Sequence, residues 1–596
     1  MSYVVNRRDL EFILFDMLDL ESLLQADRYA QFDRATITQV LDLAQSIAED
    51  HYLPSAGALD ANEPKFVDGK VDILPDVAVA LRTFADAGFF AASFDEAEGG
   101  LQLPYSVTLL LSGMFTCANL GIANYSFLTM AAAAMLSHVG SDAQKQHYLK
   151  PMLEGRWFGT MCLSETQAGS SLSDIRTRAD PLGEGRYAIT GSKMWISGGD
   201  HDLSENIVHM VLARVAGAPP GVKGISLFIV PKFRVREDGT LGDRNDVSLA
   251  GLNHKMGHRG TTNCLLNFGE AGACEGWLVG EPHQGLAAMF HMMNEARISV
   301  GMGSVMSGLA GYLYSLDYAR TRTQGRLPGD KDPTTAPVPI IDHADIRRML
   351  LNQKVAVEGG LALCAFCALL VDQQGIADTA KDREDIGLLL ELLTPIAKSW
   401  PSEHCLEANK DAIQILGGYG YTREYPVERF YRDNRLNHIH EGTYAIHGID
   451  LLGRKVRLRQ GAAVDLLIAR MEATMHRARS AGILVEEATA LANAIATLRQ
   501  TTRAVVASDD LRLGLANATL YLDGFGTVVL SWIWLWQALV ALDAADPETS
   551  DFCAGKVSAC RYIFRYMLPH ALEQLRLVAT LDDTCLAMRA DAFVTT

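Results

Sequence analysis

Hydrophobic and polar positions divide the chain into three successive patterns. Up to about residue 155, apolar residues recur at spacings of three and four, which is the period of an amphipathic helix. The clearest segments are LEFILFDMLDLESLL (10–24), TITQVLDLAQSIAEDHYL (36–53) and VAVALRTFADAGFF (77–90). Residues 60–76 and 96–104 are rich in Gly, Pro and acidic residues, so we predict connecting loops there.

The second pattern, from about residue 156 to 275, consists of short β-branched and apolar runs separated by turn residues. The runs are RYAITGSKMWISGG (186–199), NIVHMVLARV (206–215), GISLFIVPKF (224–233) and CLLNFGE (264–270). No long helical period interrupts them, so they predict an antiparallel β domain.

Helical periodicity returns after about residue 282 and continues to the end of the chain. A Gly-rich break at 416–426 interrupts it, and a further Ala-rich block with several Trp residues follows residue 458. The predicted fold class is α+β, mainly α. The predicted domains are 1–155 (helical), 156–278 (β), 279–458 (helical) and 459–596 (additional helical).

Composition narrows the class of protein. A chain of 596 residues predicts roughly three or four domains. The formal net charge of −18, from 53 basic and 71 acidic residues, disfavours nucleic-acid binding. Ten irregularly spaced cysteines predict no disulfide framework, and the start MSYVVNRRDLEF does not have the pattern of a secretion signal. We therefore expect a cytoplasmic protein.

One segment, 525–542 (FGTVVLSWIWLWQALVAL), approaches the length of a membrane span. It contains Ser531 and Gln537 and stands alone, so we favour a buried helix and expect no transmembrane segment. The motif Cys364-x-x-Cys367 lies in an apolar helical context, and we assign it no function.

The segment HIHEGTYAI (438–446) offers a first chemical candidate. Glu441 could be a carboxylate on a tight loop, where partial burial would raise its pKa and suit a general base. Two other interpretations stay open. Glu441 could simply occupy a helix N-terminus, or it could join His438, His440 and His447 in a metal site.

Two further segments could hold a flat or phosphorylated ligand. The loop MCLSETQAGSSLSD (161–174) offers hydroxyls and backbone N–H groups, and Trp195 in KMWISGG (193–199) could lie against a ring system. The alternative for these is an ordinary turn and a core Trp.

The GGYG turn (417–420), with Arg322 and Gln324, could approach a pyrophosphate, although most such turns are structural.

Taken together, these segments resemble the acyl-CoA dehydrogenase family of flavoenzymes. The resemblance rests on MCLSETQAGS (161–170), KMWIS (193–197), KMGHRGTTN (255–263), GWLVGEPHQGLAAMFHMMNEARISVG (276–301), YARTRTQGR (318–326), QILGGYGYTREYPVERFYRD (414–433) and HIHEGTYAI (438–446), which occur in family order. The long C-terminal block resembles a larger bacterial subfamily that acts on fatty acyl-CoAs or 3-(methylthio)propionyl-CoA. The implied fold has helical, β and helical domains plus the extra helical block.

The resemblance implies that Glu441 is the catalytic base, which removes the α-proton of an acyl-CoA thioester. A hydride then passes from the β-carbon to FAD, giving a trans-2-enoyl-CoA. The thioester oxygen would accept a hydrogen bond from the backbone N–H of Glu441. Some branched-chain relatives instead carry the base at the position of Ala296, so this placement resembles the straight-chain type.

The remaining site residues also follow from the resemblance. Implied substrate contacts are Ser170, Arg297 and Gly442. Implied FAD contacts are Met161, Leu163, Ser164, Gly169, Ser170, Trp195, Ser197, Arg322, Gln324, Gln414, Gly417, Gly418 and Thr443, and no metal is expected. The ADP half would bind residues of a neighbouring subunit, which implies a homodimer or homotetramer. Three departures from the family pattern, Thr166, Ser171 and His440, leave the CoA contacts and the pH profile open.

The expected function is therefore dehydrogenation of medium- to long-chain acyl-CoA in fatty-acid β-oxidation, with electron-transfer flavoprotein as acceptor. A 3-(methylthio)propionyl-CoA dehydrogenase is the alternative within the same subfamily. An acyl-CoA oxidase, which passes electrons to oxygen, and a non-catalytic acyl-CoA-binding protein are further alternatives. The sequence does not give the acyl chain length.

Overall fold

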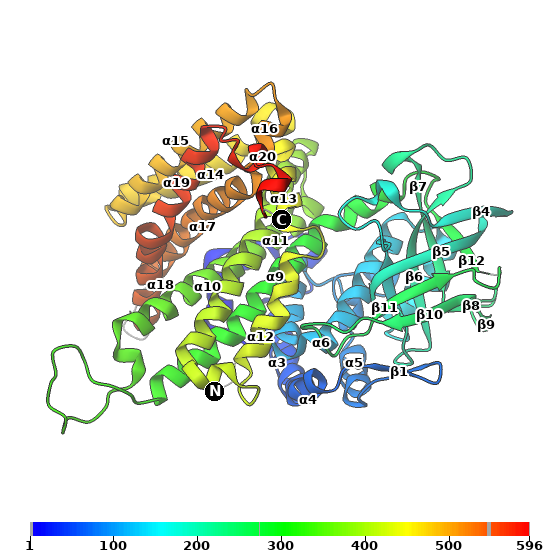
Figure 1. The fold of residues 1–596 in the computed structure, drawn as a ribbon, viewed down its shortest axis with the longest axis horizontal. Helices are drawn as coiled ribbons and strands as arrows, with labels where there is room; N and C mark the ends of the chain where they lie inside the picture. The colour runs from blue at the N-terminus through cyan, green and yellow to red at the C-terminus, as the bar shows by residue number, and fades with distance from the viewer. Residues whose placement is uncertain (1–3, 273, 545–549, 595–596) are drawn as a thin grey trace. The chain divides into compact units, whose positions relative to one another are not determined.

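The computed structural model describes residues 4–272, 274–544 and 550–594 (Figure 1). The chain forms two compact units. The sheet unit comprises Arg34–Ala296, and the helical unit comprises Tyr3–Asp33 together with Arg297–Thr596. The first and last parts of the chain therefore fold together, although they are far apart in sequence. The division into four domains stays a prediction.

The sheet unit begins with helices that the apolar periodicity predicted. Its helices are α3 (Arg34–Ile47), α4 (Ala56–Ala61), α5 (Asp76–Asp86), α6 (Tyr105–Val139), α7 (Asp142–Gln144) and α8 (Lys150–Leu153). The segment predicted as a loop at 60–76 also contains a hairpin, β1 (Lys65–Val67) and β2 (Lys70–Asp72). Asp68 and Gly69 both have positive φ, as a tight two-residue hairpin turn requires.

The remaining strands of this unit follow the predicted β region. They are β3 (Trp157–Cys162), β4 (Arg178–Gly183), β5 (Arg186–Ser197), β6 (Asn206–Val215), β7 (Ile225–Pro231), β8 (Phe233–Val235), β9 (Leu241–Arg244), β10 (Val247–Leu252), β11 (Asn263–Phe268) and β12 (Glu275–Val279). In the described residues, β10-β11-β5-β12-β7-β6-β3 form one path of hydrogen-bonded neighbours, and β4 pairs with β5 and β6.

The sheet is antiparallel at most of its strand pairs, as predicted, but two pairs are parallel. β6 pairs in parallel with both β3 and β4. A parallel pair needs a long crossover connection, and the segment between β3 and β6 is long enough to hold β4 and β5. The alternation of short runs in the sequence does not reveal such a crossover.

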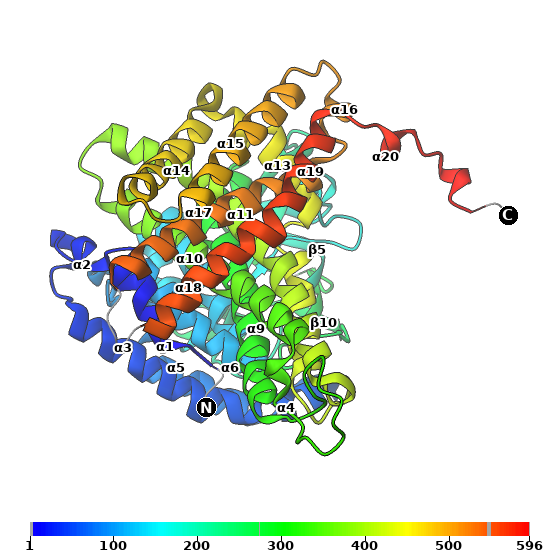
Figure 2. The ribbon, with the colours of Figure 1, turned by 90° about the vertical axis from the view of Figure 1, so that its left-hand side faces the viewer.

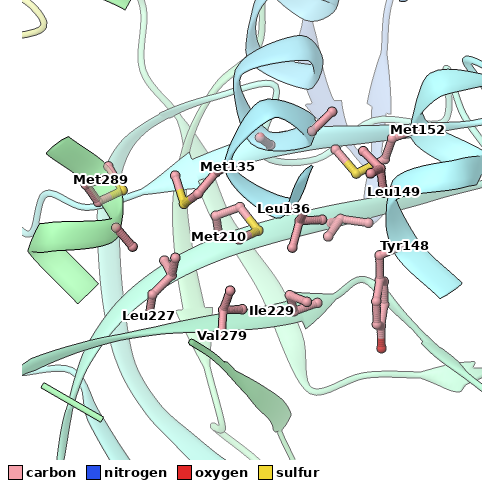
Figure 3. Close-up of a cluster of buried hydrophobic side chains, with 14 of the residues drawn as sticks. Met135, Leu136, Tyr148, Leu149, Met152, Met210, Leu227, Ile229, Val279 and Met289 are labelled. Carbon is pink, nitrogen blue, oxygen red and sulfur yellow. The ribbon is translucent and has the colours of Figure 1, made fainter. Parts of the chain in front are cut away.

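Apolar side chains of several elements fill the space between the sheet and its helices (Figure 3). They come from α6, from the segment that leads into α8, from β6, β7 and β12, and from the start of α9. Among them are Met135, Leu136, Tyr148, Leu149, Met152, Met210, Leu227, Ile229, Val279 and Met289. Because close-packed interiors resist displacement, this core fixes β3 and β6 relative to α6.

The helical unit contains long helices. Its elements are α1 (Arg7–Glu11), α2 (Leu20–Leu23), α10 (Ala344–Ile376), α11 (Ala380–Leu416), α12 (Val427–Asn434), α13 (Tyr444–Gly453), α14 (Ala462–Ala481), α15 (Val485–Val506), α16 (Leu511–Leu515), α17 (Ala518–Asp543), α18 (Ser550–Tyr562), α19 (Leu568–Ala579) and α20 (Thr584–Ala587). Helix α9 (Gly285–Thr321) begins in the residue range of the sheet unit and continues in this one. Figure 2 shows the segment after α19 leading away from the other helices of this unit.

Helix α17 contains the apolar segment 525–542. It packs against α10, α11, α13, α18 and α19. Gly526 and Gly359 permit this close packing, because an added Cβ would lie 2.6 Å from the rings of Trp400 and Trp534, respectively.

From the sequence, we treat 525–542 as the one segment that approaches a membrane span. The structure describes three helices that are long and apolar enough to cross a membrane. In α6, α10 and α17, respectively, 83%, 94% and 89% of the apolar window is buried inside the protein. This burial accounts for the apolar character of 525–542 by packing within the chain.

Candidate active site

Glu441 lies on a tight turn immediately before α13. Glu441 and Gly442 have φ values of +50° and +89°, so two consecutive residues are left-handed. A Cβ on Gly442 would lie 2.8 Å from Nε2 of His447, which explains the glycine. The Thr443 side chain then caps the helix by accepting a hydrogen bond from Ile446 N at 3.5 Å. The predicted tight loop before a helix is therefore present.

The alternative interpretations of Glu441 do not match this geometry. Thr443, and not Glu441, is the helix cap. His438 faces Glu403 at 2.7 Å, His440 contacts Asn437 Oδ1 at 3.0 Å, and His447 Nε2 donates to the Glu441 carbonyl oxygen at 3.0 Å. Within the part of the chain that the structure describes, no group of three or more His, Cys, Asp or Glu side chains could hold a metal ion.

Two cations lie near the Glu441 carboxylate. Arg297 on α9 pairs with Asp450 Oδ2 at 3.1 Å, and Lys398 on α11 donates to the Gly442 carbonyl oxygen at 2.7 Å. Solvent reaches Glu441, yet desolvation by the surrounding protein raises the pKa of its carboxyl group, against the opposing charges of Lys398 and Arg297. A raised pKa suits a general base that works near neutral pH.

The sequence of α11 explains why α9 and α11 approach closely here. Pro401 lacks the N–H that would bond to the Ala397 carbonyl oxygen four residues earlier. That oxygen would lie 2.0 Å from a Cβ on Gly301 of α9, so only glycine fits. It also accepts a hydrogen bond from Cys364 Sγ at 3.7 Å, which gives a packing role to one of the cysteines left unassigned.

A second group of predicted residues gathers at the C-terminal end of α11. Arg322 lies 5.8 Å from the Tyr419 ring centroid, and its Nη2 donates to Gln324 Oε1 at 3.4 Å. Gly417 and Gly418 are exposed, and an added Cβ on either would meet nothing within 4 Å. Gln414 is also exposed, on the last turn of α11. Exposed amides, an Arg fork and open glycines form a surface on which a pyrophosphate fits.

The structure does not bring this second group to Glu441. Lys398, which contacts the Glu441 turn, and Gln414 are both on α11. At 1.5 Å per residue, their separation of 16 positions is roughly 24 Å along the helix. Of the predicted cofactor residues in the helical unit, Thr443 alone lies beside Glu441.

In the sheet unit, a buried carboxylate shapes the loop that follows β3. Glu165 accepts hydrogen bonds from Arg176 N at 2.7 Å and Thr177 N at 3.0 Å, and it pairs with Lys193 Nζ at 2.9 Å. Burial opposes its ionisation, but Lys193 and these donors lower the Glu165 pKa to about 2. Lys193 also donates to Leu163 O at 3.0 Å, so the loop is fastened to β5.

This loop presents the predicted flavin residues beside β5. Ser164 exchanges two hydrogen bonds with Met194, each of 3.0 Å, and Ser197 Oγ accepts one from Asn263 at 3.2 Å. Met161, Leu163, Ser164 and Ser197 are half-buried, whereas Gly169 and Ser170 are exposed.

Trp195 is not a core residue, so that alternative is wrong. It is 59% exposed and has φ +67°, a genuine outlier for a bulky side chain. The pairing of β5 with β11 shifts register around it, and such a bulge redirects a side chain. An exposed indole held this way offers a face to a flat ring.

Sequence reasoning missed the ion pair Glu165–Lys193, and it missed Lys398. The signal for Lys398 is a lysine in the apolar run LLLELLTPIAKSWP, which places a charge on the buried side of a helix. The signal for the pair is weaker, because Glu165 and Lys193 are 28 positions apart and lie in two different motifs.

Comparison with known proteins covers nearly the whole chain. The matching family models are described as "Acyl-CoA dehydrogenase, N-terminal domain" (residues 35–156), "Acyl-CoA dehydrogenase, middle domain" (160–271), "Acyl-CoA dehydrogenase, C-terminal domain" (283–456) and "Acetyl-CoA dehydrogenase C-terminal like" (467–589).

Several curated relatives match nearly from end to end. The 3-methylmercaptopropionyl-CoA dehydrogenase of Ruegeria pomeroyi is 34% identical, over 98% of this chain and 99% of its own. The broad-specificity linear acyl-CoA dehydrogenase FadE5 of Mycobacterium tuberculosis is 32% identical, over 99% and 100%. Among solved structures, an acyl-CoA dehydrogenase of Bacillus anthracis in complex with FAD has a TM-score of 0.72 at 20% identity, covering 95% of this chain and 94% of its own. At that identity the likeness shows the fold.

Proposed function

The chain belongs to the acyl-CoA dehydrogenase family of flavin-dependent oxidoreductases, which bind FAD, and we propose that it oxidises straight-chain saturated acyl-CoA to trans-2-enoyl-CoA. The Glu441 turn carries the proposal. It holds a carboxylate of raised pKa on a backbone that leaves the Glu441 N–H without an acceptor among the described residues.

In this reaction, Glu441 takes the α-proton of the thioester onto its carboxylate. The Glu441 N–H is placed to donate to the thioester oxygen, where negative charge develops; losing one such donor costs about 3 kcal/mol. Arg297 is almost fully buried, and its Nε has no partner among the described residues, so it can contribute a further donor on the substrate side.

The residues present fit FAD. The exposed Trp195 suits a flat ring, and the exposed Gly169 and Ser170 and the open Gly417–Gly418 turn with Arg322 suit a pyrophosphate. When bound, FAD supplies the acceptor for the β-hydride. The chain's share is to orient the substrate and to move the proton.

One feature supports a shared cofactor site in a homodimer or homotetramer. Gln414, which belongs to the Arg322 group, lies roughly 24 Å along α11 from Lys398, which contacts the Glu441 turn. A neighbouring subunit that supplies the ADP-binding group would resolve this separation.

We place the enzyme in the cytoplasm, with electron-transfer flavoprotein as its acceptor.

For the substrate, we propose medium- to long-chain acyl-CoA in fatty-acid β-oxidation. The 3-methylmercaptopropionyl-CoA dehydrogenase of Ruegeria pomeroyi is 34% identical, against 32% for FadE5. It supports a second candidate substrate, 3-(methylthio)propionyl-CoA. In both, the reacting carbons are unbranched, in keeping with Ala296 in place of a second carboxylate.

The test is a steady-state series of acyl-CoAs from four to eighteen carbons, with the methylthio substrate included and a ferrocenium-type acceptor. We expect the highest kcat/KM at medium to long chain length. A preference for the methylthio compound would select the second candidate. Failure of every thioester to reduce the flavin would overturn the proposed activity, and peroxide formation without an added acceptor would indicate an oxidase.

A further inference from the structure

Lys398 is a buried amine for which the reaction as described has no use. It is fully buried on α11, between Pro395 and Pro401. Its Nζ donates to the Gly442 carbonyl oxygen at 2.7 Å. No described carboxylate lies within ion-pairing distance of it, and a buried cation with only a carbonyl partner is costly. Such a cost is retained where the charge serves a nearby group.

The nearby group is the Glu441 carboxylate. Opposite charges on Glu441 and Lys398 each favour the ionised form of the other. Burial still lowers the Lys398 pKa to about 7. Lys398 therefore carries its charge in the same pH range in which a carboxylate of raised pKa ionises.

The other groups around Glu441 do not replace this charge. Arg297 on α9 is already engaged by Asp450 on α13 at 3.1 Å. His447 on α13 is neutral, because burial lowers its pKa to about 3, and it donates to the Glu441 carbonyl oxygen. His440, the preceding residue, contacts Asn437.

We propose that Lys398 is a positioning residue for the base: it holds the Glu441–Gly442 turn through the Gly442 carbonyl oxygen and keeps the Glu441 carboxylate ionised before proton transfer. The proposal rests on the proposed role of Glu441. Left-handed backbone is disfavoured for a non-glycine residue, so the turn needs outside support. Lys398 supports one of its carbonyl groups, and His447 supports the other.

Variants at this position separate the charge from the hydrogen bond. Lys398→Met removes both, Lys398→Gln keeps a neutral donor, and Lys398→Arg keeps the charge. Lys410→Met is the matched control, because Lys410 lies on the same helix but is exposed and pairs with Glu407. Thermal unfolding of each FAD-loaded variant checks that it is folded.

The readout is the pH dependence of the rate at which a straight-chain acyl-CoA reduces the flavin. Loss of a neighbouring positive charge raises a carboxyl pKa by roughly one unit or more. We expect the acid limb of Lys398→Met and Lys398→Gln to move upward by that amount. Lys398→Arg and Lys410→Met should keep the wild-type acid limb. If Lys398 had only a structural role, Lys398→Met and Lys398→Gln would keep the wild-type acid limb as well.

An unmoved acid limb in folded Lys398→Met and Lys398→Gln would overturn the proposal. A shift in Lys398→Arg as large as in Lys398→Gln would also overturn it, because the charge would then not matter. If Lys398→Met does not fold, the Gln and Arg pair carries the comparison. If the wild type is reduced but the acid limbs of the variants do not move, only the role of Lys398 is rejected. If the wild type itself is not reduced, the proposed function is rejected as well.

Discussion

Trp195 combines a strained backbone with an exposed ring. A non-glycine residue held at positive φ costs about 1–3 kcal/mol, and an indole that is 59% exposed recovers little of that by burial. The bulge between β5 and β11 therefore holds a side chain that contributes little to the core of the sheet unit. This arrangement is expected where a side chain faces a ligand.

We predict that Trp195→Ala separates stability from cofactor binding. The variant should lose less than about 1 kcal/mol of the free energy of unfolding and bind FAD roughly 2- to 10-fold more weakly. Trp157→Ala is the control, because Trp157 is 2% exposed in β3 and its truncation should cost about 3–5 kcal/mol. Denaturant unfolding without FAD and fluorescence titration with FAD measure the two effects. Equal destabilisation by both variants would contradict a ligand-facing Trp195.

At the scale of elements, the sequence predicted what depends on local order. Period and turn residues indicated the helices, the strands β5, β6, β7 and β11, and the Glu441 turn. They did not reveal the parallel pairing of β3 with β6 or the contact between Lys398 and Gly442. Both depend on residues far apart in the chain, and no local pattern encodes such contacts. The hairpin β1–β2 was missed despite a local signal, the Asp68-Gly69 dipeptide.

A buried charge cluster joins four helices of the helical unit. Lys556 on α18 donates to Asp9 on α1, to Glu358 Oε2 on α10 at 2.8 Å and to Gln537 Oε1 on α17 at 2.9 Å. Its Nζ also lies 5.1 to 5.4 Å from three aromatic ring centroids, those of Phe12, Trp534 and Phe552. The C-terminal block is thereby fastened to the catalytic helices and to the start of the chain.

We predict that Lys556→Met costs about 3–5 kcal/mol of the free energy of unfolding, because it leaves the buried Asp9 carboxylate without its cation. Glu358, in contrast, keeps its pair with Lys354. Arg561→Met on the same helix, an exposed position, should cost less than about 0.5 kcal/mol. Urea unfolding of both variants decides the point. Equal effects would show that the cluster is not important for stability.

The deficit of Lys556→Met, which is its loss of free energy of unfolding relative to the wild type, should also depend on pH. Burial and the charge of Glu358 raise the Asp9 pKa from 3.8 to about 6, against the charge of Lys556. A raised carboxyl pKa stabilises the folded state below about pH 4, and this stabilisation is lost as pH rises through 6. Without Lys556 the Asp9 pKa rises further, so the deficit should be larger at about pH 8 than at about pH 5. A deficit that is the same at both pH values would contradict this.

At the scale of the whole molecule, the block after residue 458 has a structural role. The block after residue 458 supplies α17, whose apolar surface is buried on α10, α11 and α13. Removing it would expose the facing sides of those helices. The extension is therefore part of the core of the helical unit.

Truncation tests this. We predict that a chain ending at residue 458 is insoluble or fails to bind FAD. A chain ending at Asp582, which loses only residues that are exposed where the structure describes them, should remain soluble and active. Sedimentation and flavin absorbance of the two purified products provide the comparison. A soluble, fully active product ending at 458 would show that the block is dispensable.

If Glu441 removes the α-proton of an acyl thioester, its carboxylate is needed for flavin reduction. Anaerobic mixing of FAD-loaded protein with a straight-chain acyl-CoA, with flavin absorbance followed, measures this. The wild type should bleach, and Glu441→Gln, folded and with equal FAD content, should bleach at least about 10²-fold more slowly. Bleaching of Glu441→Gln at the wild-type rate would contradict the assignment of the base.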